Sequence, residues 1–168
     1  MMEKVYLHLI DLLVFCGLIF AILKYWERKV LRANFLETMN SSYAVFIVGQ
    51  IISIVVVYMT VNDEQVLAYI DNFSPFDKKS SVFWSIYGIE ILGFILVYLI
   101  SNLLAHLMFF SCIKSSKGIY KDIVENKIGS SFLIVSILIS ISLILSNSVL
   151  RPFIFNFITS NSPIKFFN

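Results

Sequence analysis

Histidine and cysteine are scarce in this chain, with two residues of each among 168. Cys16 and Cys112 both lie inside apolar runs, without a metal-ligand spacing, so we interpret them as small buried hydrophobic residues. The sequence contains no His-x-x-x-His pair, no Gly-x-Ser-x-Gly elbow, no glycine-rich phosphate loop and no plausible Ser/His/Asp set. These absences predict a protein that is not an enzyme and that holds no metal or cofactor.

Charge is scarce as well: Asp, Glu, Lys and Arg make up 14% of the chain, against 58% hydrophobic residues. With a mean hydropathy of +0.85, the chain has too little polar surface to cover a water-soluble fold. No small-x-small cleavage site follows the first apolar run, so we expect that run to stay in the membrane. The few cations are diluted by acids, which excludes a direct nucleic-acid partner. The composition therefore predicts an all-α, polytopic membrane protein surrounded by the lipid bilayer.

Four apolar runs have the length that crosses a bilayer, roughly 20 residues. Lipid offers no hydrogen-bond partner to an unpaired backbone amide, so each run must be helical. The third run is longer than a bilayer requires, which predicts a tilted or projecting helix. The predicted spans are 5–23, 41–61, 82–113 and 128–150, which form a four-helix transmembrane domain (1–150) of two tandem hairpins at about 5–61 and 82–150.

Basic residues gather in two of the three connections. Residues 24–40 and 114–127 each contain four, whereas residues 62–81 contain two lysines against four acids. Cytoplasmic connections carry the excess of Lys and Arg in membrane proteins. We therefore predict that the first and third connections lie in the cytoplasm, and that the second connection and both termini lie outside.

The end of the sequence, residues 151–168, is dominated by aromatic residues. It begins with Arg151–Pro152, which we expect to stop the preceding helix, and continues with Phe153, Phe155 and Phe157. It is too short, and too broken by proline, to cross the membrane. We predict that this tail lies along the outer interface or packs against a neighbouring subunit.

Two segments of the chain resemble each other at an offset of 86 residues. The offset aligns Asn40 with Asn126 and Phe46 with Phe132, and each segment opens a span after a basic connection. An even number of crossings separates the two segments, so they share one orientation in the membrane. The chain thus reads as two helical hairpins in tandem.

Three short features of the sequence are the motifs Glu37-Thr-Met-Asn40 and Asp122-Ile-Val-Glu-Asn126, and Trp84 six residues before Glu90. In these features the sequence resembles the YjfL-type family of bacterial inner-membrane proteins. The resemblance implies a duplicated four-span fold in the bacterial inner membrane, with no assigned chemistry, although Ile and Ser stand where that family has Gly and Ala. In its small size and minimal loops the chain is more loosely similar to the membrane subunit, KwaA, of Kiwa-type anti-phage defence systems. That similarity implies antiviral defence beside a co-encoded cytosolic effector.

Three polar residues fall at membrane depth: Asp11, Gln50 and Glu90. At 1.5 Å per residue, Asp11 and Glu90 lie about 9 and about 12 Å below the outer surface, and Gln50 lies near the midplane. Intramembrane ionisable groups usually face protein or water. They either line a polar cavity that senses or conducts ions or protons, or they join helices, with Glu90 protonated or hydrogen-bonded. His106 is expected near the cytoplasmic headgroups.

Small residues recur at helical spacing in two spans. Gly49 and Ser53 allow close approach of another helix. Ser136, Ser140 and Asn147 fall along one face of the last span, where they either pack against a helix or wet a pore in a homo-oligomer.

The cytoplasmic connections offer a docking surface for a cytosolic partner. In the first, Trp26, Val30 and Ala33 recur at near-helical spacing; this face either docks a partner or rests on the headgroups. We predict a non-enzymatic, oligomeric membrane protein that senses membrane or envelope state and anchors or signals to that partner. The alternative is an ion or proton channel formed by oligomerisation. The predicted docking residues are Trp26, Arg28, Lys29, Arg32, Lys117 and Lys121.

Overall fold

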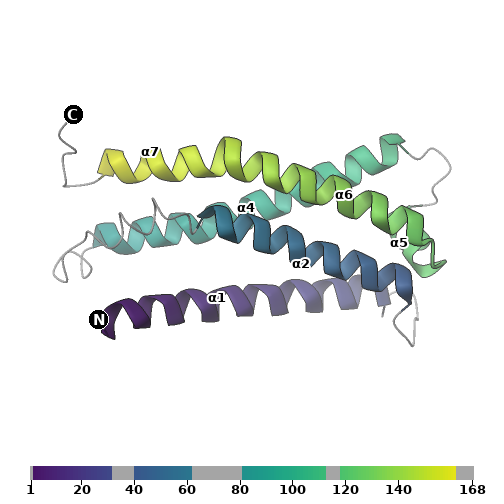
Figure 1. Ribbon diagram of the computed structural model, residues 1–168, viewed down its shortest axis with the longest axis horizontal. Helices are drawn as coiled ribbons and strands as arrows, with labels where there is room; N and C mark the ends of the chain where they lie inside the picture. Colours follow the sequence, from purple (N-terminus) through teal and green to yellow (C-terminus); the bar gives the residue numbers. More distant parts are fainter. Residues whose placement is uncertain (1, 32–39, 62–80, 113–117, 162–168) are drawn as a thin grey trace.

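The computed structural model describes residues 2–31, 40–61, 81–112 and 118–161, without the side chains of 2–11, 31, 61, 81–87, 90 and 158–161. These residues form four long helical segments, the first and last of which contain a π-helical turn (Figure 1). Their bounds are α1 (Met2–Trp26) with η1 (Glu27–Leu31), α2 (Ser41–Val61), α4 (Ser81–Cys112), and α5 (Ile119–Val124) followed by α6 (Ile128–Leu145), η4 (Ser146–Leu150) and α7 (Arg151–Asn161).

The helices follow the apolar runs of the sequence. Over the part of the chain that is described, the protein is all-helical, and α2 coincides with the predicted span 41–61. Three helical segments are long and apolar enough to cross a bilayer: Ser41–Thr60, Ile91–Cys112 and Ile128–Phe157. The prediction of an all-α chain with membrane-length helices is confirmed at this level.

The four segments alternate in direction along the bundle (Figure 1). α1 and α4 begin at the end of the bundle where α2 and α7 end, and α5 lies at the opposite end. α6 makes its broadest contacts with α2 and then with α4, whereas α1 lies against α2. The last segment is therefore the centre of the packing.

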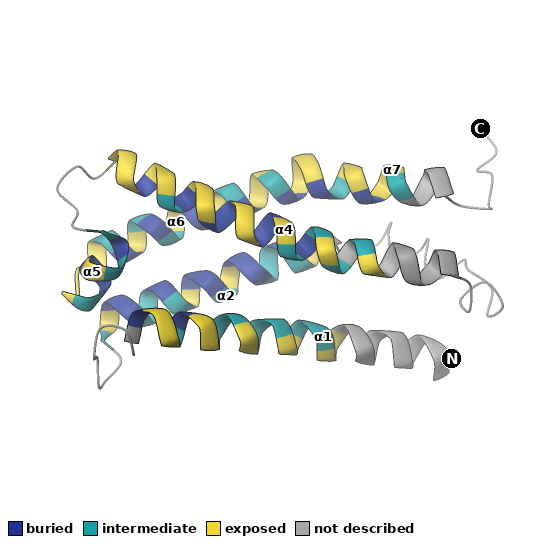
Figure 2. Cartoon of the chain, turned by 180° about the vertical axis from the view of Figure 1, so that it is seen from behind, coloured by how far each residue is buried: buried dark blue, intermediate teal, exposed yellow. Residues whose placement is uncertain are grey.

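Exposed residues recur along the helices of the bundle (Figure 2), and many of them are large hydrophobic side chains. Large side chains such as Phe20, Met59 and Ile144 are more than 60% exposed. Cys16 and Cys112 are also exposed, so the prediction that both thiols are buried was wrong. The physical reason is that a membrane helix presents apolar side chains to lipid as well as to other helices.

The predicted helix stop at Arg151–Pro152 is not observed, because the chain stays helical to Asn161. In the turn before the proline, the Arg151 N–H donates to Ser146 O, five residues back. A π-helical turn of this kind is wider than an α-helical one and leaves room for the proline ring. Pro152 directly follows this turn, and the helix continues through α7 without the N–H that proline lacks.

The interior contains two clusters of buried hydrophobic residues. One lies toward α7 and joins α2, α4, η4 and α7 through residues such as Ile54, Phe94 and Leu150. The other lies toward α5 and joins all four segments through residues such as Trp26, Phe46 and Phe109. Together they fix the bundle along its length.

α2 and α6 meet along a close, parallel contact, which we call the α2–α6 seam. It is defined by two hydroxyl pairs and one glycine contact. The pairs are each 89 residues apart in sequence, so the two helices run parallel in constant register. A Cβ on Gly49 would lie 2.8 Å from Val135 Cβ and closer still to its methyl groups, so only glycine fits. The seam residues are Ser42–Ser131 and Ser53–Ser142, both with Oγ–Oγ distances of 2.6 Å, and Gly49–Val135.

Two asparagines exchange contacts at the α5 end of this seam. Asn40 accepts from the Tyr43 N–H at 2.7 Å, which caps α2. Its amide Nδ2 also donates to Ile123 O at 2.8 Å, at the end of α5. Asn126, at a φ of 57°, accepts from the Ser42 N–H at 3.0 Å and so caps α2 from the other hairpin. The two segments that resemble each other in sequence are thus parallel neighbours joined at their first turns.

Candidate functional site

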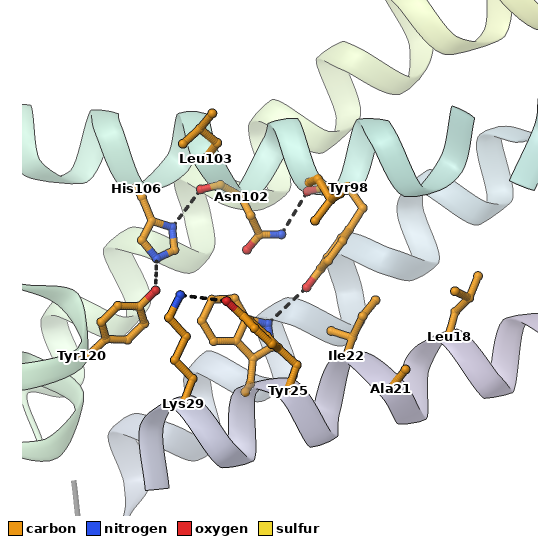
Figure 3. Close-up of a pocket in the computed structure, with 12 residues that line it drawn as sticks. Leu18, Ala21, Ile22, Tyr25, Lys29, Tyr98, Asn102, Leu103, His106 and Tyr120 are labelled. Carbon is orange, nitrogen blue, oxygen red and sulfur yellow. Dashed lines mark hydrogen bonds between the residues drawn. The ribbon is translucent and has the colours of Figure 1, made fainter. Parts of the chain in front are cut away.

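A cavity of about 550 Å³ lies between α1 and α4. One end is apolar and is lined by Leu18, Ala21 and Ile22 of α1 (Figure 3). Leu99 and Leu103 of α4 also line the cavity. The other end lies toward α5 and brings polar and aromatic groups together. These are Tyr25, Trp26, Lys29, Asn102, His106 and Tyr120.

Lys29 is the cation at the polar end. Its Nζ lies 5.0 Å from the ring centroid of Tyr120, 5.2 Å from that of Tyr25 and 5.5 Å from that of Trp26. The ammonium donates to the Tyr25 hydroxyl at 2.8 Å, and this bond raises the pKa of Lys29 above its ordinary value while burial opposes the rise. Among the described side chains no carboxylate forms an ion pair with it. Within the described residues the site therefore carries one positive charge without a paired carboxylate.

A buried row of polar groups backs the cavity and joins three helices. The Tyr98 hydroxyl donates to Gln50 Oε1 at 2.6 Å and accepts from Trp26 Nε1–H at 3.3 Å. Gln50 Nε2 is buried and has no hydrogen-bond partner within the described residues. A polar row in an apolar bundle holds its members in one arrangement, because leaving any of them unpaired is costly.

Asn102 places an unpaired acceptor at the polar end. Its Nδ2 donates to Tyr98 O at 3.0 Å, which fixes the amide so that Oδ1 points from α4 toward α1 (Figure 3). That Oδ1 is buried and has no partner in the described part of the chain.

His106 and Tyr120 close the same end. His106 Nδ1 lies 2.8 Å from Asn102 O, and a carbonyl only accepts, so Nδ1 carries the proton. Nε2 of the neutral ring then accepts from the Tyr120 hydroxyl at 3.2 Å. Both groups are thus engaged with each other and with the backbone of α4.

The predicted docking residues occupy three kinds of position. Arg28, Lys29 and Lys121 are exposed, whereas Trp26 is only 4% exposed. Trp26 is buried because its indole N–H is needed by Tyr98 and its ring packs edge-on against Phe46. A face offered to a partner near η1 would therefore consist of its cations. The docking residues Arg32 and Lys117 lie outside the described residues.

The predicted intramembrane residues are described only in part. Gln50 is fully buried and belongs to the row just described. The side chains of Asp11 and Glu90 lie outside the described residues, although their backbones belong to α1 and α4.

The predicted small residues divide between the interior and the surface. Gly49 and Ser53 lie in the α2–α6 seam. Ser136, Ser140 and Asn147 are exposed, and each donates to a carbonyl of its own helix four residues earlier. Their side chains thus face away from the bundle while bonded to its backbone.

Sequence reasoning did not find the α4 residues that build the cavity. Tyr98, Asn102 and His106 recur every fourth residue, so they share one face of the helix. Tyr25 and Lys29 have the same spacing at the end of the first segment. These two polar stripes are a signal that a search for buried charges alone overlooks.

Three comparisons with known proteins end without a relative: no family model, no curated protein and no solved structure matches the chain. Within the described residues no group of three or more His, Cys, Asp and Glu could hold a metal ion. The described side chains offer the site one cation, one buried acceptor and an apolar lining.

Proposed function

We propose that the chain crosses the bacterial inner membrane four times, with η1 and α5 at the cytoplasmic side and both termini outside. The distribution of basic residues supports this orientation, since Lys24 lies in the last turn of α1 and Arg28 and Lys29 follow that helix. The alternating directions of the four helical segments support it too, because η1 and α5 lie at the same end of the bundle (Figure 1). The first crossing is α1, which has 25 residues and so about 37 Å of length.

Within this topology the protein acts as a non-enzymatic sensor of membrane state that signals to a cytosolic partner. One observation carries the proposal: Lys29, from the first cytoplasmic connection, and Tyr120, from the third, meet at the end of the α1–α4 cavity. A change of contents or width in the cavity would move both connections together. The exposed cations beside them, Arg28 and Lys121, are then the surface through which a partner reads the change.

The loose family similarities are consistent with this sensor role. In that role the chain is an oligomeric membrane subunit of a defence system and acts beside a cytosolic effector. Native mass in mild detergent would test the oligomer, for which we expect a multiple of the 19.3 kDa chain. No contact among the described residues favours the channel alternative over a sensor.

Site-specific photocrosslinking in living cells tests the proposal. We would place a photoreactive amino acid at Arg28 or Lys121, and at Leu143 as a control on the exposed face of α6. We expect both cytoplasmic positions to crosslink to the same soluble protein, and Leu143 not to do so. If neither position captures a soluble protein under inducing conditions such as phage infection, the signalling role is wrong.

A further inference from the structure

The α1–α4 cavity has the dimensions of a site for an amphiphile. Its volume of about 550 Å³ falls in the range of small-molecule sites. Lys29 follows Leu18 by eleven residues, so the polar end lies about 16 Å along the helix from the apolar end. Leu99 and Leu103, which line the α4 side of the cavity, are more than half exposed, so the cavity is open along this side. A molecule that fills the cavity needs a compact polar head and an apolar chain.

The polar end favours an anionic head. Lys29 remains charged, since its pKa is raised, and among the described side chains neutral hydroxyl and ring groups surround its ammonium. The aromatic faces around it are already occupied by its own ammonium, so they cannot receive a cationic head such as choline. A phosphodiester oxygen would complete the hydrogen bonds of the ammonium.

The same end requires a hydrogen-bond donor on the ligand. Asn102 Oδ1 is more than nine-tenths buried and unpaired in the described part of the chain. The hydroxyl donors beside it are engaged, because the Tyr98 hydroxyl donates to Gln50 and the Tyr120 hydroxyl donates to His106. An unpaired buried acceptor is costly, so a hydroxyl that reached it would bind favourably.

We propose that the cavity binds an anionic glycerophospholipid of the cytoplasmic leaflet whose headgroup carries a hydroxyl. The phosphodiester lies at Lys29, the hydroxyl donates to Asn102 Oδ1, and one acyl chain runs past Ile22 and Ala21 toward Leu18. This inference rests on the proposed membrane orientation and names the component of the membrane that the sensor reads. Phosphatidylglycerol has this chemistry; free glycerol phosphate shares the head but leaves the apolar end empty.

Native mass spectrometry of the delipidated full chain in detergent tests the proposal. The probes are phosphatidylglycerol, phosphatidylcholine, phosphatidylmethanol, which is anionic but lacks the hydroxyl, and glycerol phosphate. We expect phosphatidylglycerol to bind about fivefold more tightly than phosphatidylcholine, as one lysine near a lipid head implies, and glycerol phosphate not to bind. Equal binding of the three lipids by the wild-type protein would overturn the proposal, and binding of glycerol phosphate would make the cavity a phosphate site.

Variants then locate the site. Lys29→Gln should lose the preference for anionic lipids, and Lys24→Gln should keep it, because Lys24 is exposed and paired with Glu27. Asn102→Leu should lose only the preference for phosphatidylglycerol over phosphatidylmethanol. Ala21→Phe should weaken all lipid binding by filling the apolar end. Unfolding temperatures establish that each variant is folded.

A Lys29→Gln variant that is folded and keeps the wild-type preference would overturn the assignment, as would loss of the preference in Lys24→Gln. If a variant does not fold, the relative affinities of the wild-type protein for the three lipids still test the proposal. The two proposals also fail separately. Absent crosslinks with an intact lipid preference would contradict the signalling role alone, and intact crosslinks without a lipid preference would contradict this inference alone.

Discussion

Two pairs of helices in this bundle treat their polar residues in opposite ways. Along the α2–α6 seam, hydroxyls pair with hydroxyls at 2.6 Å. Between α1 and α4, a cavity separates the helices, and Asn102 Oδ1 is buried without a partner in the described residues. Lipid supplies no hydrogen bonds, so polar residues in a membrane bundle either join helices or serve a site. The seam therefore holds the bundle together, whereas the cavity contains an acceptor that a ligand can hydrogen-bond.

The largest effect on stability should follow from adding a methyl group in the α2–α6 seam. In Gly49→Ala the added Cβ meets Val135, a stiff β-branched residue, so the helices must separate. We expect a loss of about 1–3 kcal/mol in the free energy of unfolding, the usual cost of overpacking. Denaturant titration in detergent micelles measures it.

Gly17→Ala is the matched control, because a Cβ there meets nothing within 4 Å. It should be neutral or slightly stabilising, since alanine is the better helix former. A second change, Val135→Ala, should relieve part of the Gly49→Ala cost. Equal effects of the two glycine substitutions would mean that the seam is no tighter than the lipid-facing surface.

The next largest loss of stability should come from removing the contacts that Asn40 makes between the two hairpins. Asn40→Ala removes the cap of α2 and the bond to Ile123 O, which should cost about 1–2 kcal/mol. Asn147→Ala is the control, because Asn147 is exposed and bonds only within its own helix. Thermal unfolding of both variants would show whether the two hairpins are joined at this point; matching melting temperatures would indicate that they are not.

A smaller effect is expected from the paired hydroxyls. In a double-mutant cycle of Ser53→Ala and Ser142→Ala, the coupling should be about 0.6 kcal/mol, as for other hydrogen bonds between membrane helices. The same cycle with Ser140 in place of Ser142 should give no coupling, since Ser140 bonds to its own helix. Coupling in the second cycle would contradict the assigned register.

The smallest effect on stability is expected at Lys127, at the start of α6. Two hydrogen bonds raise the pKa of Lys127 above its ordinary value of 10.5. The bond with Asp122 has the larger effect and the bond with Glu125 the smaller. A raised pKa means stabilisation that is complete below the ordinary value and lost as the pH rises through the folded-state value. The unfolding temperature of Lys127→Gln should therefore lie below that of the wild type by a constant amount from pH 7 to 9. The gap should close above about pH 10.5; a gap that widens there would contradict the ion pair.

The scaffold was far easier to predict than the site. The bounds of α2 follow from an apolar run between a capping asparagine and polar residues, which is local information. The continuation past Pro152 was missed because the π-helical turn before it has no clear sequence signal. The burial of Trp26 and the cavity depend on how far α1 stands from α4, which the spacing of Tyr98, Asn102 and His106 does not give.

Pulsed electron resonance between spin labels tests most directly whether the seam is fixed and the cavity adjustable. Labels would be placed at exposed residues after replacing both native cysteines by serine: Val48 with Ser140 on the two helices of the seam, and Leu13 with Leu96 on the two helices that flank the cavity. We predict a narrow seam distance that is the same in phosphatidylcholine and phosphatidylglycerol bilayers, and a broader cavity distance that narrows in phosphatidylglycerol. A seam distance that changes with lipid, or a cavity distance that does not, would contradict the account.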